Sequence, residues 1–449
     1  MDACGLQDPA ARADSLLVEF VAAQSPARLE SGTRATWPEL ESELGRVLDE
    51  RLVTPVFQPL VDLDSRRVAA YEALARGPAG SPLEQPAALF PVAREAGRLA
   101  ELDYLCRARA VSMAMDAEPP DGTGLFVNVE PATLSDPCPA DLLDDLEPPI
   151  GLRPFIEITE RALTARPAEL LGELARMREL GWGVALDDVG ADSRSLALMP
   201  LLRPDVIKLD LRLVQDRPTA EIAEIVNAVL AERERTGATI VAEGIETEEH
   251  LCTAQAMGAT LGQGWLLGRP GPLPDTSVLA APAPKLLSAP LAPAGATPFE
   301  TVSPGRDVRR ADKRLLLAMS LHLERQAAQV GAGAIILSAF QQADRFTPAT
   351  VRRYERLAAS SSFVVALGVG MPARPARGVR GARLDRSDPL CGEWSVVVLG
   401  PHFAGALVAV DLGDDGPDMR RRFDYTVTYE RQAVVDAART LAARVERLA

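Results

Sequence analysis

The chain has 449 residues, of which 47% are hydrophobic and 25% are charged, with a formal net charge of −15. This length allows two or three domains, and the negative charge argues against general binding to DNA or RNA, which requires a basic surface. No apolar run approaches the roughly 18 residues of a membrane span, and the N-terminus shows no signal-peptide pattern. The five cysteines lie at scattered positions that suit neither a disulfide framework nor a zinc site. We therefore expect a reduced, cytoplasmic protein with no nucleic-acid polymer or membrane as partner.

Residues 1–42 predict an N-terminal extension with one amphipathic helix, at 15–21, followed by polar, loop-like sequence. From residue 43 to residue 272, hydrophobic strands alternate with helical stretches, which is typical of a (β/α)8 barrel of the TIM type. Only residues 64–67 join the first two strands, and so short a link predicts an antiparallel pair. The expected strands are 53–63, 68–74, 125–129, 155–158, 184–186, 206–209, 239–242 and 261–267. The expected helices include 91–117, 168–180, 220–235 and 248–257.

The composition changes after the barrel. Residues 273–311 are rich in proline and alanine, which predicts a semi-stiff linker without regular structure. Helix and strand patterns return in residues 312–449, which predict a separate, smaller α/β domain. Its expected elements are 315–329, 334–340, 363–367, 394–399, 406–411 and a closing helix at 430–448.

Polar residues that can bind metal or activate water follow the hydrophobic runs of the predicted barrel. Parallel strands bring their carboxyl ends to one rim, so these side chains should gather there. Crowded carboxylates repel one another unless cations bind among them. Oxygen ligands without His or Cys suit Mg²⁺ or Mn²⁺ rather than zinc. The set is Glu72, Asn128, Glu157, Asp187, Lys208, Glu243 and Gln263.

This set predicts a site with two metal ions, which can clamp a phosphodiester and lower the pKa of a bridging water. Lys208 would hold that water or the developing negative charge, and Glu243 would act as the base. Arg76 would contact a phosphate. One ion would be held by Glu72, Asn128, Glu157 and Asp187, and the second by Asp188.

Each of these residues also has a structural alternative. Five of them could simply be solvated polar residues at strand ends: Glu72, Asn128, Glu157, Asp187 and Asp188. Lys208 could be a surface lysine or form an ion pair with Asp210, and Glu243 could cap the turn at Gly244. Gln263 could simply provide hydrogen bonds to polar groups at the barrel rim, and Arg76 could form an ion pair with one of the crowded acids.

The same residues carry a family resemblance. The segment Tyr71-Glu72-Ala73-Leu74-Ala75-Arg76 resembles the signature of the EAL family of cyclic di-GMP phosphodiesterases, and further motifs follow in order across residues 43–272. These motifs are Phe57-Gln58-Pro59, Val127-Asn128-Val129, Glu157-Ile158-Thr159-Glu160, Asp187-Asp188, Lys208-Leu209-Asp210, Ala242-Glu243-Gly244-Ile245-Glu246 and Gln263-Gly264.

The resemblance implies a modified barrel that hydrolyses cyclic di-GMP to linear pGpG with Mg²⁺ or Mn²⁺, two ions being expected. It implies that Gln58, Leu74 and Arg76 contact the nucleotide and that Gln263 serves the water and substrate. It further implies that Glu160 supports the loop after Asp188. The oligomeric state stays open, with a homodimer as one option.

The loop after Asp188 departs from the family pattern. Residues 189–195 (Val-Gly-Ala-Asp-Ser-Arg-Ser) lack the two aromatic residues and the second glycine of active members. A catalytically weak or inactive receptor that signals by binding cyclic di-GMP is therefore the alternative function. The third hypothesis is a pure protein-interaction scaffold whose barrel is the relic of an enzyme. Such a relic should have lost metal-binding acids, and none is missing.

Residues 312–447 have a weaker resemblance to the DICT domain, a presumed sensory module. It is carried by Phe340-Gln341-Gln342, Arg345-Phe346-Thr347, Tyr354-Glu355-Arg356-Leu357, Glu393-Trp394, Leu399-Gly400-Pro401-His402-Phe403 and Arg422-Phe423-Asp424. This resemblance implies regulation of the barrel but names no ligand.

Overall fold

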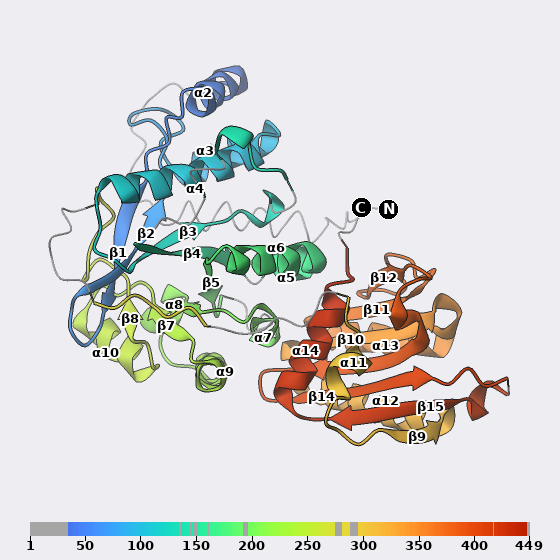
Figure 1. The fold of residues 1–449 in the computed structure, drawn as a ribbon. Coiled ribbons are helices and arrows are strands. Elements are labelled where there is room, and N and C mark those ends of the chain that lie inside the picture. The colour runs from blue at the N-terminus through green and yellow to red at the C-terminus, as the bar shows by residue number, and fades with distance from the viewer. Residues whose placement is uncertain are drawn as a thin grey trace, which may run out of the picture.

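The structure is a computed structural model (Figure 1) that describes residues 35–133, 136–142, 146, 151–159, 161–191, 196–273, 281–287, 295–415 and 417–446. The helix expected at 15–21 lies outside these residues. The first described helix, α2 (Trp37–Asp49), begins at a capping box of Thr36 and Glu39 and buries Leu44 and Val47. No helix among the described residues is long and apolar enough to cross a membrane.

Eight strands form a closed barrel in chain order. β1 runs antiparallel to both β2 and β8, and the other neighbours are parallel. The predicted TIM-type barrel with an antiparallel first pair is thus confirmed. The strands are β1 (Val56–Asp62), β2 (Val68–Leu74), β3 (Thr123–Asn128), β4 (Leu152–Thr159), β5 (Gly183–Val189), β6 (Val206–Leu209), β7 (Thr239–Ala242) and β8 (Leu261–Gly262). The helices are α3 (Pro86–Glu95), α4 (Leu99–Asp116), α5 (Arg161–Ala165), α6 (Pro167–Glu179), α7 (Met199–Leu202), α8 (Leu211–Gln215), α9 (Ala220–Thr236) and α10 (Glu248–Ala256).

Two predicted elements of the barrel are wrong in extent. The strand expected at 261–267 ends at Gly262, because Gly264 adopts a φ of 154° and lies against the backbone of Ile245, where a Cβ would clash. The helix expected at 91–117 is divided between α3 and α4. Gly97 lies between them with a φ of 69°, a left-handed conformation that a helix cannot contain.

The C-terminal domain is a seven-stranded sheet in the order β12-β11-β10-β13-β14-β15-β9. Alternate residues of β10 face opposite layers: Ile335 and Leu337 pack in the layer of α14, whereas Ile336 packs in the layer of α12 and α13. The domain comprises α11 (Pro298–Val302), β9 (Arg309–Asp312), α12 (Lys313–Val330), β10 (Ile335–Gln342), α13 (Pro348–Ser360), β11 (Phe363–Val369), β12 (Arg380–Leu384), β13 (Glu393–Leu399), β14 (Ala404–Asp411), β15 (Arg422–Thr428) and α14 (Arg431–Ala442).

The prediction that residues 273–311 lack regular structure is wrong for their C-terminal part. α11 begins at Thr297, whose side chain and that of Glu300 form a capping box, and β9 begins at Arg309. Residues 281–287 are irregular, but they pack across the amino ends of the barrel strands. There Ala281 N donates to Val68 O at 2.7 Å, and Arg153 Nη1 donates to Pro284 O at 2.8 Å.

The two domains share one continuous cluster of buried apolar residues. In Figure 1, α14 lies on the side of the C-terminal domain that faces α5, α6 and α7 of the barrel. All four residues of α7 are buried.

Candidate active site

Strand register brings the predicted site residues to one rim of the barrel. Gln58 lies opposite Glu72 in the β1–β2 pair, and Asn128 lies opposite Glu157 in the β3–β4 pair. Asp187 lies opposite Thr159, two residues beyond Glu157. Lys208 and Glu243 extend the same rim from β6 and the end of β7, since Lys208 pairs with Val241. The predicted convergence is therefore observed.

Lys208 lies at the centre of this rim, and its side chain is only 1% exposed. The Nζ atom is 2.7 Å from Glu157 Oε1 and 2.8 Å from Glu243 Oε1. It is 3.1 Å from Asp187 Oδ1 and 3.4 Å from Glu72 Oε2. The alternative pairing with Asp210 is wrong, because Asp210 caps α8 and pairs with Arg212.

The crowding changes the protonation of these groups. Burial lowers the pKa of Lys208, but the surrounding carboxylates, Asp187 first, outweigh it and hold that pKa well above its ordinary value. Burial and the charge of Glu72 raise the pKa of Glu157 well above its ordinary value. Burial raises the pKa of Glu72 too, but Lys208 and the hydrogen bonds to Glu72 outweigh it, so the net shift is downward. Burial is also the main cause that raises the pKa of Glu243 to about 8.

The donor set fits a divalent cation. Carboxylate oxygens of Asp187, Asp188 and Glu243 lie within 4.8 Å of one another. Glu157 Oε2 is buried and has no hydrogen-bond partner among the described residues, so it is an oxygen that a cation would satisfy. Asn128 Nδ2 donates to Glu72 Oε1 at 3.2 Å, so the amide lies beside a carboxylate that also contacts Lys208. Asp188 is exposed and has a φ of 55°, and the β5–β6 register shifts between Leu186 and Val189, so Asp188 lies in an irregularity near the end of β5.

The remaining predicted residues lie around this centre. Gln263 Nε2 donates to Glu72 Oε2 at 2.8 Å and to Gln58 Oε1 at 2.9 Å, while Gln263 Oε1 is buried without a partner among the described residues. Gln58 Nε2 donates to Gly268 O at 3.2 Å. Arg76 and Leu74 are half-buried where β2 ends.

Among the described residues, Arg76 forms no ion pair with the rim acids, and its Nη1 donates to Ala75 O at 2.8 Å. Likewise Glu243 contacts Lys208 by its side chain, so its carboxylate faces the acid cluster. Glu160 and residues 192–195 lie outside the described residues, so their predicted roles stay predictions.

A buried network behind Asn128 was missed by the sequence analysis. Asp103 is 2% exposed and pairs with Arg107 at 2.8 Å. Its oxygens also accept from Glu130 N at 3.0 Å and from Thr133 Oγ1 at 2.9 Å. Asp103 thus fixes the loop that follows β3. An Asp and an Arg four residues apart on a helix ordinarily form a surface pair, so the sequence gives no signal for this role.

Comparison with known families agrees with the geometry. The EAL domain matches residues 41–270, which is half of the chain. The chain belongs to the EAL family. Residues 299–412 match the DICT domain, described as a sensory domain in diguanylate cyclases and two-component systems. Both predicted resemblances are confirmed.

Several curated proteins are similar to the EAL domain of this chain. Cyclic di-GMP phosphodiesterase RocR of Pseudomonas aeruginosa is 34% identical over 152 residues, covering 33% of this chain and 39% of RocR. Probable cyclic di-GMP phosphodiesterase PdeG of Escherichia coli is 28% identical over 238 residues, covering 51% of this chain and 47% of PdeG. An uncharacterized signaling protein of Caulobacter vibrioides is 32% identical over 236 residues, covering 51% of this chain and 28% of that protein. The chain spans less than half the length of each of these relatives.

Two solved structures of complexes with cyclic di-GMP are also similar to part of this chain. The complex of Klebsiella pneumoniae BlrP1 with manganese and cyclic di-GMP at pH 9.0 is 31% identical, with a TM-score of 0.44, and covers 49% of this chain and 56% of BlrP1. The PaMucR phosphodiesterase complex with cyclic di-GMP is 25% identical, with a TM-score of 0.45, and the match covers 52% of this chain and 97% of PaMucR in that structure.

Proposed function

We propose that the EAL domain hydrolyses cyclic di-GMP to linear pGpG with Mg²⁺ or Mn²⁺. The observation that carries this proposal is the rim itself, where the carboxylates of Glu72, Glu157, Asp187 and Glu243 surround Lys208 and Asp188 lies beside Asp187 and Glu243. The named phosphodiesterases among the relatives support the substrate.

In this proposal the first ion is held by Glu72, Asn128, Glu157 and Asp187, and the second by Asp188. When bound, the ions would supply a water of lowered pKa and positive charge beside the phosphodiester. Lys208 stays protonated and stabilises negative charge on the reacting oxygens. Glu243 would take the proton of the attacking water. Burial raises the pKa of Glu243 to about 8, so its carboxylate is available as a base above that pH or when the charge of a bound cation lowers the pKa.

The residues around the centre would position the nucleotide. Arg76 has no acidic partner on the rim, so its guanidinium can donate to a phosphate. Gln263 holds Glu72 and Gln58 together, and its free Oε1 can accept a hydrogen bond from substrate or water. Leu74 would supply an apolar contact at the edge of β2.

Incubation of the purified chain with cyclic di-GMP tests this proposal. We expect pGpG to form with Mg²⁺ or Mn²⁺ and not with chelator, as measured by chromatography of the products. The absence of pGpG with either metal would contradict it.

A cyclic di-GMP receptor without turnover is the second candidate. It is motivated by the unusual loop at 189–195 and by Lys208, whose ammonium already offsets part of the acid charge without metal. This candidate expects tight nucleotide binding in chelator together with no turnover in metal. A titration in chelator that shows no binding would eliminate it.

A further inference from the structure

The C-terminal domain supplies hydrogen-bond partners for the backbone at one corner of the barrel, where α5 ends and α6 begins. A helix leaves its last carbonyls and first N–H groups unpaired, and they need partners from elsewhere. The residue before α6, Arg166, provides no side-chain cap. Ala168 N, in the first turn of α6, instead donates to Val445 O at 3.2 Å, in the tail that follows α14.

Arg380 provides hydrogen bonds to the end of α5 at the same corner. It is the first residue of β12, and it is only 9% exposed. Its Nη2 donates to Ala165 O at 3.2 Å, and its Nη1 donates to Thr164 O at 3.5 Å, so it covers the end of α5. Nη2 also donates to Glu446 O at 2.5 Å. One guanidinium therefore joins the barrel to the tail that caps α6.

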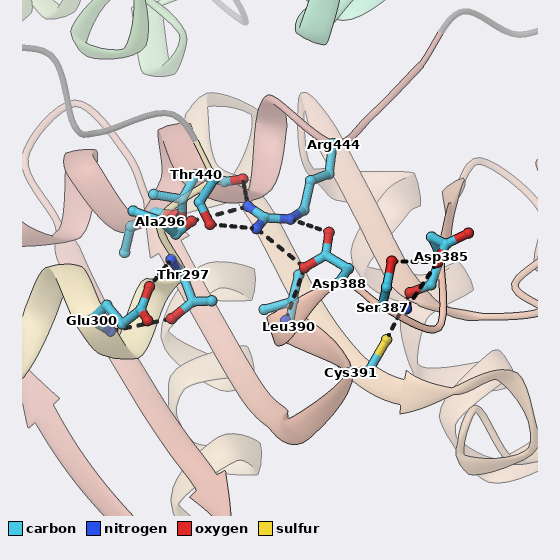
Figure 2. A network of polar contacts seen from close by, with 12 residues as sticks. Ala296, Thr297, Glu300, Asp385, Ser387, Asp388, Leu390, Cys391, Thr440 and Arg444 are labelled. Carbon is cyan, nitrogen blue, oxygen red and sulfur yellow. Dashed lines mark hydrogen bonds and ion pairs between the residues drawn. The ribbon is translucent and has the colours of Figure 1, made fainter.

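The tail is itself held in place by contacts within the C-terminal domain. Figure 2 shows Arg444, whose Nε donates to Asp388 Oδ2 at 2.8 Å and whose Nη1 donates to Thr440 O at 2.8 Å and to Ala296 O at 3.1 Å. Arg444 fixes the neighbouring Val445 and Glu446, so the tail can act as a rigid support for the barrel corner.

This corner leads directly into the rim of acids. α5 begins two residues after Thr159, the last residue of β4. Thr159 pairs with Asp187, and Glu157 lies two residues earlier on the same strand. The chain therefore connects α5 through β4 to Glu157 and to the strand pair that holds Asp187. On the other side of the Asp188 loop, Arg203, which follows α7, lies 4.0 Å from Asp436 of α14.

We propose that Arg380 of the DICT domain is a positioning residue for the metal site of the barrel, acting through the α5–α6 corner and the Thr159–Asp187 pair. The proposal rests on the proposed function for the identity of the site. With Arg380 in place, the carboxylates stand close enough to share a cation; without it, the corner loses its fixed position and the site binds metal less tightly.

The test compares Arg380→Ala and Arg380→Lys in the full chain with wild type. Arg353→Ala is the matched control, because Arg353 pairs with Glu324 of α12 on the opposite face of the same sheet. Calorimetry measures Mn²⁺ binding, hydrogen exchange measures protection at residues 161–170, and product analysis gives kcat and KM. Thermal unfolding tests whether each variant is folded. If Arg380→Ala does not fold, the comparison with wild type uses Arg380→Lys.

We expect Arg380→Ala to weaken Mn²⁺ binding by about fivefold or more, the lower end of typical coupling between sites. Exchange at residues 161–170 should become faster, and kcat should fall with little change in KM. Arg380→Lys should restore part of the affinity, and Arg353→Ala should leave it unchanged. Unchanged Mn²⁺ affinity in Arg380→Ala would overturn the inference alone. A wild-type chain that binds Mn²⁺ but forms no pGpG would overturn the proposed function alone, and one that binds no Mn²⁺ would overturn both.

Discussion

Replacement of Lys208 by Met tests whether this lysine is the cation that holds the acids of the rim together without metal. The substitution keeps most of the side-chain volume and removes the charge. Four carboxylates, those of Glu72, Glu157, Asp187 and Glu243, then face one another with no ammonium between them.

The size of the effect follows from the burial of the site. Removal of one partner from a buried ion pair costs about 3–5 kcal/mol of unfolding free energy, because the remaining charge is left uncompensated. The acids can escape this cost by taking up protons, so the loss should be smaller at low pH. A divalent cation replaces the missing charge and contributes about 2.7 kcal/mol when its concentration is 100 times its dissociation constant. The mutation should therefore cost most at pH 8 in chelator.

Urea unfolding of wild type and Lys208→Met in chelator, at pH 5.5 and at pH 8, measures these differences, and a second series contains Mn²⁺. Lys313→Met is the control, since Lys313 pairs with Asp418, whose side chain is 60% exposed. Such a surface pair is worth about 0–1 kcal/mol. Equal stability of Lys208→Met and wild type at pH 8 in chelator would refute the reasoning, as would a cost that Mn²⁺ does not reduce.

Two further substitutions test other parts of the structure. Glu72→Ala should abolish pGpG formation while the circular dichroism spectrum stays that of wild type; retained turnover would remove Glu72 from the site. Burial raises the pKa of Glu393 from 4.5 to about 7, although hydrogen bonds from Thr297 and Phe299 N oppose the shift. The folded state therefore binds more protons than the unfolded state between these values, and stability falls as pH rises through this window, by at most about 3 kcal/mol. Glu393→Gln should flatten this dependence in urea unfolding from pH 4.5 to 8, whereas an unchanged slope would assign it to other groups.

The barrel could be predicted from the sequence because its strands end on chemically distinctive residues in a fixed order. The short link between β1 and β2 predicted their antiparallel pairing for a simple geometric reason. The strand expected at 261–267 was too long because the apolar residues 265–267 after Gly264 look like its continuation, whereas Gly264 lies against the backbone of Ile245.

The helix α11 was missed although its capping box, Thr297 to Glu300, is present in the sequence. The density of prolines around it outweighed that local signal. Proline at the first position of a helix is in fact favourable, because its missing N–H needs no partner there.

The candidate site was predicted at the level of its residues but not of its contacts. Sequence order identifies Lys208 as one member of the rim, but only the closed barrel shows that it contacts four carboxylates at once. The supports of the site come from distant segments. Arg380 lies 215 residues from Ala165, which it contacts, and no local pattern encodes such a pairing.

Anomalous diffraction from crystals that contain Mn²⁺ and cyclic di-GMP tests the central claim most directly. Two peaks are expected beside the nucleotide phosphate, one among Glu72, Asn128, Glu157 and Asp187 and the other at Asp188. Nucleotide bound on the rim without a manganese peak at these residues would contradict the account.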